Sequence, residues 1–168
     1  MAITAHSPAA DKPMPALHDL IAPRTVAMLT TRDGSAGVLV SRPVTTIEVE
    51  GADTVWFIIA ADSGIARDVA GDPQLCLSYM DRGEGDYLSL RGEGGIVPDR
   101  SRIAALWNPA FKVWFEGPDD PNIALLRVAV REIEHWDTPS TTAGRMFAFA
   151  RALASGDASG LGHHARGG

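Results

Sequence analysis

Cysteine and positive charge are both scarce in this sequence. The single cysteine, Cys76, excludes a disulfide within the chain and favours a reducing cytoplasm as its location. The 15 Lys and Arg residues are outnumbered by 21 Asp and Glu residues, whereas a nucleic acid or an anionic membrane calls for a basic face. No apolar run approaches the length of a membrane span, and the N-terminal stretch MAITAHSPAADKPMPA lacks the basic start and apolar core of a signal peptide. We therefore expect a cytoplasmic protein that binds neither nucleic acid nor membrane.

Common nucleotide and metal signatures are missing as well. Gly92, Gly94 and Gly95 do not have the spacing of a dinucleotide fingerprint, no helix follows them directly, and no P-loop occurs. The pairs Asp119–Asp120 and His163–His164 have no third ligand near them, so we predict no metal site. No nucleophile with an adjacent base and no acid–base pair stands out, so the sequence leaves the catalytic residues unassigned.

The apolar pattern predicts about six strands with short links between them. Residues 54–60 are apolar on both faces and predict a central strand. The glycines at 92, 94 and 95 predict a bulge or a close approach of another backbone, and a phase shift near Arg131 predicts a bulge. One helix inserted after the third strand favours a small antiparallel barrel over a parallel α/β sheet. We expect strands at 25–31, 37–49, 54–60, 74–80, 87–97 and 123–136, and helices at 15–22, 63–71, 99–107 (resuming at 110–115) and 140–155. One domain, residues 15–155, would lie between a flexible arm (1–14) and a flexible tail (156–168).

Two positions are candidates for anion binding. Ser41 and Arg42 should point to opposite faces of their strand, and Pro43 has no N–H for a ladder, so the strand is at an edge, bulged or ending there. A hydroxyl and a guanidinium beside such a break can bind an anion, although an ordinary surface arginine is the commoner outcome. Ser63 begins a helix directly after a strand, and the free N–H groups of a helix start also attract anions.

Several motifs in order resemble one known family. The segments VLVSRPV, VWFIIAADS, QLCLSYMD, YLSLRGEGGIVPDR and WFEGPDDP, within residues 15–136, resemble the FMN-binding split barrels, in the general-stress-protein branch of the pyridoxamine 5′-phosphate oxidase-like superfamily. The resemblance implies a mainly β fold with peripheral helices, built as a six-stranded antiparallel Greek-key split β-barrel. It also implies a homodimer, with FMN or FAD bound in clefts shared by the two subunits.

The same resemblance implies a set of flavin-binding residues. They are Val40, Ser41, Arg42 and Pro43 along the flavin and its phosphate, Ile58 and Ile59 beside the ring, Ser63, Gly64 and Ile65 at the phosphate, and Trp114 near the isoalloxazine. Ile65 departs from the family, whose members often carry Lys there, and Arg67 lies elsewhere on the helix. No Arg-x-His element follows Trp136, which argues against oxidation of vitamin B6 itself.

Three functions are compatible with this sequence. The first is a flavin-dependent oxidoreductase reduced by NADH, NADPH or another small-molecule reductant, in which the flavin carries the hydride and the protein positions it. The second is a flavin carrier or sensor without turnover, with a role in stress. The third is a barrel that has lost flavin and binds another ligand. Ile65 favours the second and third, whereas Ser41, Arg42, Pro43 and Ser63 favour the first and second.

Overall fold

A computed structural model describes residues 5–6, 14–81, 86–137 and 163–167 of the chain. Its elements are β1 (Ala5–His6), α1 (Leu17–Ile21), β2 (Val26–Arg32), β3 (Leu39–Glu50), β4 (Thr54–Ala60), α2 (Gly64–Gly71), β5 (Gln74–Asp81), β6 (Asp86–Val97), α3 (Arg100–Leu106), the 3₁₀ helix η1 (Pro109–Val113), β7 (Ile123–Asp137) and β8 (His163–Gly167). The strands predicted from the sequence agree with β2–β7 to within a few residues. The helix expected at 140–155 lies outside the described residues.

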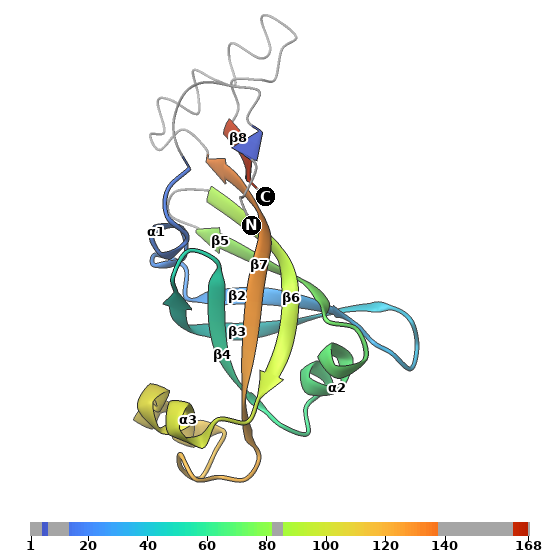
Figure 1. The fold of residues 1–168 in the computed structure, drawn as a ribbon, viewed down its shortest axis with the longest axis vertical. Coiled ribbons are helices and arrows are strands. Elements are labelled where there is room, and N and C mark those ends of the chain that lie inside the picture. The colour runs from blue at the N-terminus through green and yellow to red at the C-terminus, as the bar shows by residue number, and fades with distance from the viewer. Residues whose placement is uncertain (1–4, 7–13, 82–85, 138–162, 168) are drawn as a thin grey trace, which may run out of the picture.

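Strands β2–β7 close into an antiparallel barrel (Figure 1). The order around it is β7-β4-β3-β2-β5-β6, and β6 pairs back onto β7. Strands β2, β3 and β4 follow one another as hairpins, and the chain then passes through α2 to place β5 on the other side of β2. This return of the fourth strand beside the first is a Greek key. The predicted fold class is therefore confirmed.

Alternation of apolar and polar residues decides which faces are inside the barrel. In β2, Ala27 and Leu29 are buried while Val26 and Met28 are exposed, and β5 follows the same period. Strand β4 differs, since Val55, Trp56 and Phe57 are all buried. Trp56 packs outside the barrel with Ile103, Ile123 and Leu125, while Phe57 belongs to the barrel core, which confirms that β4 is covered on both faces.

A small second core holds α3 against the outside of the barrel. The guanidinium of Arg102 lies 4.1 Å from the centre of the Trp56 ring and donates to Glu48 and Glu50 at 2.9 and 3.1 Å. Asp99 caps the helix by accepting from the N–H of Arg102. This anchoring places η1, which follows α3, beside the barrel wall.

The bulge predicted near Arg131 is present in β7, whereas Gly92 of β6 marks the close approach of another backbone. The register shifts at Arg91–Gly92, where Glu132 faces Arg91 and Val130 faces Gly92, so that Arg131 is the extra residue. A side chain at position 92 would meet backbone, because an ideal Cβ on Gly92 would lie 2.4 Å from the carbonyl oxygen of Ala129. Glycine is required there by the close approach of β7.

Two segments differ from the expectation. The sequence predicts that a helix resumes at 110–115, whereas the structure has the 3₁₀ helix η1, which starts at Pro109 and is capped by the Asn108 side chain. Within the expected flexible arm and tail, β1 and β8 pair with each other, and β8 also extends the sheet along β7.

In the part of the chain that is described, no helix combines the length and apolar character of a membrane span.

The contact at Gly92 predicts a position-specific loss of stability. Gly92→Ala should lower the free energy of unfolding by about 1–3 kcal/mol, because the new methyl group forces the β6 and β7 backbones apart. Gly95→Ala in the same strand, where no heavy atom lies within 4 Å of the added Cβ, should change it by less than about 0.5 kcal/mol. Urea denaturation of the three proteins measures both values. Equal effects of the two substitutions would contradict the close approach.

Candidate functional site

The site begins where β3 and β4 separate. Their pairing runs from Glu50–Thr54 to Thr46–Phe57 and includes a bulge at Ile47. Beyond Thr46, residues 39–45 of β3 pair with β2 alone among the described strands, and residues 58–60 of β4 pair with β7 alone. Pro43 lies on the edge of β3 that this separation leaves open, as the sequence predicts for a residue without an N–H.

A groove of about 510 Å³ occupies this fork between β3 and β4. The start of α2 and the segment around η1 complete its walls. The lining residues are Val26, Pro43, Val44, Thr45, Ile47, Ile58, Ile59, Ala60, Ser63, Ile65, Phe111, Trp114, Phe115 and Asn122. The structure thus brings together Pro43, Ile58, Ile59, Ser63, Ile65 and Trp114 of the predicted set. It also adds Phe111, Phe115 and Asn122, which sequence reasoning missed because they come from segments beyond the barrel strands.

The chemical character of the groove is apolar. Thr45, Ser63 and Asn122 are its polar lining residues among those described, and none of the lining side chains is titratable. Trp114 lies at the rim with 70% of its surface exposed. The lining side chains thus offer no acid–base group that titrates near neutral pH, and the groove is suited to a flat, largely apolar ligand.

One end of the groove reaches the N-terminus of α2. Ser63 caps this helix, its hydroxyl accepting from the N–H of Ala66 at 3.2 Å. The N–H groups of Gly64 and Ile65 belong to the first turn and have no acceptor within the helix. The preceding loop is fixed by Asn122, whose main-chain and side-chain oxygens accept from the N–H groups of Ala61 and Asp62 at 2.8 and 3.2 Å.

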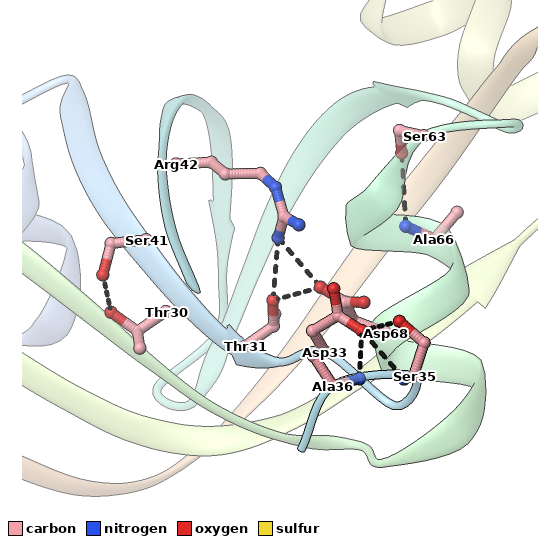
Figure 2. A network of polar contacts seen from close by, with 10 residues as sticks. All are labelled: Thr30, Thr31, Asp33, Ser35, Ala36, Ser41, Arg42, Ser63, Ala66 and Asp68. Carbon is pink, nitrogen blue, oxygen red and sulfur yellow. Dashed lines mark hydrogen bonds and ion pairs between the residues drawn. The ribbon is translucent and has the colours of Figure 1, made fainter. Parts of the chain in front are cut away.

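Arg42 lies against this helix start, but its charge is already paired (Figure 2). Its Nη1 donates to Asp68 at 2.9 Å and to the hydroxyl of Thr31 at 3.0 Å. Its Nη2 would be 2.8 Å from a Cβ placed on Gly64, so the guanidinium packs on the first turn of α2. Sequence reasoning missed Asp68, although its position four residues after Gly64 already placed both on one face of the helix.

The remaining predicted residues do not line the groove. Ser41 points to the opposite face of β3 from Arg42, as expected, and its hydroxyl is 2.8 Å from that of Thr30 (Figure 2). Val40 pairs with Thr31 across β2 and β3 and is half-buried. Gly64 contributes its backbone and the space that Arg42 fills.

Ile65 lines the groove from within the main core. Only 7% of its surface is exposed, and its side chain packs in that core beneath the groove. Arg67 points away from that core, and its guanidinium donates to the carbonyl oxygen of Asp62 at 2.5 Å.

Asp120 organises the loop that leads from the aromatic wall of the groove to Asn122. Its carboxylate accepts from the N–H groups of Asn122 at 2.8 Å and Glu116 at 3.0 Å, and these bonds hold its pKa below the ordinary value. Asp120 of the pair Asp119–Asp120 therefore caps a turn. Within the described residues, no group of three His, Cys, Asp or Glu side chains could hold a metal ion.

Comparison with known proteins identifies the family. Residues 12–159 match the model of the pyridoxamine 5′-phosphate oxidase like family. The chain belongs to this family. It is 28% identical over 140 residues to protein bli-3 of Neurospora crassa, a match that covers 77% of this chain and 67% of that protein. It is 25% identical over 83 residues to general stress protein 26 of Bacillus subtilis, covering 48% of this chain and 59% of that protein.

A solved structure from the same family group supports the fold of this pyridoxamine 5′-phosphate oxidase-like chain. It is a pyridoxamine 5′-phosphate oxidase-related, FMN-binding protein from Nostoc punctiforme, 13% identical, with a TM-score of 0.57 over 71% of this chain and 78% of that one. At this identity the likeness concerns the fold alone.

The bonds of Asp120 predict a pH-dependent contribution to stability. Because folding lowers the pKa of this carboxyl from 3.8, the ionised group stabilises the fold above that pH, and the contribution disappears as the pH falls below it. Asp120→Ala should therefore lower the urea midpoint at neutral pH and differ less from the parent near about pH 2. Its neighbour Asp119, which is exposed, provides the control, and Asp119→Ala should have little effect at either pH. A loss for Asp120→Ala that is the same at both pH values would contradict the role of its charge.

Proposed function

We propose that this protein binds a flavin, FMN in the first instance, in the groove between β3 and β4, and uses it as an oxidoreductase. The observation that carries the proposal is the combination of two features. The groove is apolar and has no titratable lining side chain, and one end of it reaches the start of α2, on which the guanidinium of Arg42 packs. A flavin has the matching parts, a flat ring system and a phosphate. When bound, it supplies hydride transfer at its own ring, so the protein needs no acid–base pair of its own.

The groove fits the ring of a flavin in size and character. Its volume of about 510 Å³ is within the range of about 300–1,000 Å³ that is typical of small-molecule sites. Ile58 and Ile59 of β4 form one wall, and Trp114 after η1 forms another. These side chains would hold the ring and exclude water from its face, with Thr45 and Asn122 available for hydrogen bonds to its polar edge.

The start of α2 fits the phosphate. The first-turn N–H groups of Gly64 and Ile65, the hydroxyl of Ser63 and the guanidinium of Arg42 all adjoin this end of the groove. We call this set the anion corner. Free N–H groups at a helix start favour an anion, and a guanidinium strengthens the binding through charge-assisted hydrogen bonds. FAD, like FMN, carries a phosphate attached to its riboflavin part, and it is therefore the second ligand to test.

A flavin carrier or stress sensor without turnover is the second candidate. The same observation favours it, since the lining side chains provide no proton donor or acceptor for a substrate. Bleaching of the bound flavin by NADH or NADPH in the absence of oxygen would support the oxidoreductase. A flavin that stays oxidised with both reductants would favour the carrier.

A homodimer is part of the proposal. Val26, Met28, Met80 and Tyr87 are neighbours on the outer face of β2, β5 and β6 and are 43–56% exposed. We call these four residues the outer apolar patch. It continues into the groove, since Val26 also lines it, and Trp114 is exposed at the rim. A second copy on this patch would remove apolar surface from water and cover the open side of the groove.

Removal of the Arg42 guanidinium tests the phosphate position. Arg42→Ala should weaken FMN binding by about 1.5–3 kcal/mol, because a charge-assisted hydrogen bond is lost and Asp68 remains unpaired. Riboflavin, which has no phosphate, should bind almost as before. Quenching of flavin fluorescence measures both affinities. Arg32→Ala serves as the control, since Arg32 pairs with Asp72 at the other end of α2. Equal losses for FMN and riboflavin would remove Arg42 from the phosphate site.

A charge in the outer apolar patch tests the dimer. Met28→Glu should convert a dimer into a monomer in sedimentation at micromolar concentration and should lower flavin affinity, because a carboxylate is costly to bury at an interface. Leu39→Glu places the same charge on the same face of the sheet, opposite Arg32 and outside the patch, and should leave the dimer intact. A parent protein that sediments as a 17.8 kDa species would exclude the shared cleft.

A further inference from the structure

We propose that Asp68 determines how strongly this site prefers a phosphorylated flavin, by cancelling the charge of Arg42. As a result, FMN and riboflavin should bind with similar affinity, and the ring rather than the phosphate should supply most of the binding. The inference rests on the proposed flavin site and concerns its choice of ligand. It follows from the geometry, exposure and charge of four side chains.

Asp68 and Thr31 hold the guanidinium from the side facing the protein interior. Asp68 Oδ2 accepts from Arg42 Nη1 at 2.9 Å and from the Thr31 hydroxyl at 2.7 Å, and Nη1 also donates to that hydroxyl at 3.0 Å. The side chain of Asp68 is 6% exposed and that of Arg42 is 29% exposed. In Figure 2 the three side chains converge from β2, β3 and α2, and Ser63 begins the same helix that carries Asp68. Burial and these two hydrogen bonds therefore fix the carboxylate behind the guanidinium.

The side-chain charges at the anion corner cancel. Arg42 contributes one positive charge and Asp68 one negative charge, and Ile65 contributes none. Asp33, in the turn between β2 and β3, is a further acidic group close enough for the charge of Arg42 to help lower its pKa, although the hydrogen bonds from Ser35 are the main cause. A phosphate at this corner would thus be attracted by the guanidinium and the helix start and repelled by Asp68, which is 2.9 Å from the guanidinium.

The consequence is a weak dependence of affinity on the phosphate. A phosphate monoester is close to a dianion at neutral pH, since its second pKa is about 6. For such a group the repulsion from Asp68 offsets much of the attraction to Arg42. We therefore expect FMN to bind the parent protein no more than about tenfold more tightly than riboflavin, which corresponds to less than about 1.4 kcal/mol.

An isosteric substitution isolates the charge. In Asp68→Asn the amide oxygen can still accept from Arg42 and Thr31, so the guanidinium keeps its place while the negative charge is lost. The dissociation constant for FMN should fall by about 5–30-fold, and that for riboflavin should stay within about twofold. The gain should shrink with added salt, because the corner is partly open to solvent.

The matched control lies on the same helix. Asp72 follows the last residue of α2 and pairs with Arg32 at 3.3 Å, so Asp72→Asn makes the same change of net charge at the far end. It should leave both affinities unchanged. Fluorescence titration of the parent and the two variants with FMN and riboflavin gives six dissociation constants, and thermal denaturation of each protein verifies that it is folded.

The outcomes separate this inference from the proposed function. FMN binding more than about a hundredfold more tightly than riboflavin to the parent, or an equal effect of Asp68→Asn on both ligands, would overturn the role of Asp68 while leaving the flavin site intact. Absence of binding by either flavin to every protein would instead overturn the flavin site. Should Asp68→Asn fail to fold, the FMN-to-riboflavin ratio of the parent and its salt dependence test the proposal without any variant.

Discussion

The separation of β3 from β4 is the constraint on which the site depends. A barrel strand normally pairs along both edges, whereas β3 pairs with β2 over residues 39–45 and with β4 only over residues 46–50. Pro43 has no N–H to give to a third strand, and the bulge at Ile47 follows it where the pairing with β4 begins. The last residues of β4 pair with β7 instead. The barrel therefore carries a groove in its wall without losing the buried core that stabilises it.

Segments distant in the sequence complete the groove, and each is held by its own interactions. Asn122 fixes the loop before α2 through two main-chain N–H groups. Arg102 and the small core around Trp56 hold α3, and with it the aromatic residues that follow. These contacts orient the walls before any ligand arrives, which reduces the entropy that binding would otherwise cost.

The Arg42–Asp68 pair shows how stability and binding compete at this site. A partly buried guanidinium needs hydrogen-bond acceptors and a compensating negative charge. The carboxylate of Asp68 and the hydroxyl of Thr31 provide both. The same carboxylate reduces what the guanidinium can offer to a ligand. A second cation would strengthen a phosphate site, and Ile65, which lines the groove and packs in the core, supplies none.

The sequence by itself determined the features that depend on neighbouring residues. Alternation revealed the barrel strands, the phase shift near Arg131 revealed the bulge in β7, and Ser63 revealed the start of α2, because strand faces, bulges and caps are local. The resemblance to a family added the barrel topology. Only the tertiary structure decided that Arg42 is bound by Asp68, 26 residues away, that Ile65 belongs to the core, and that Val40 and Ser41 do not line the groove. Such partners depend on how α2 docks across the barrel, and no local pattern of residues encodes that docking.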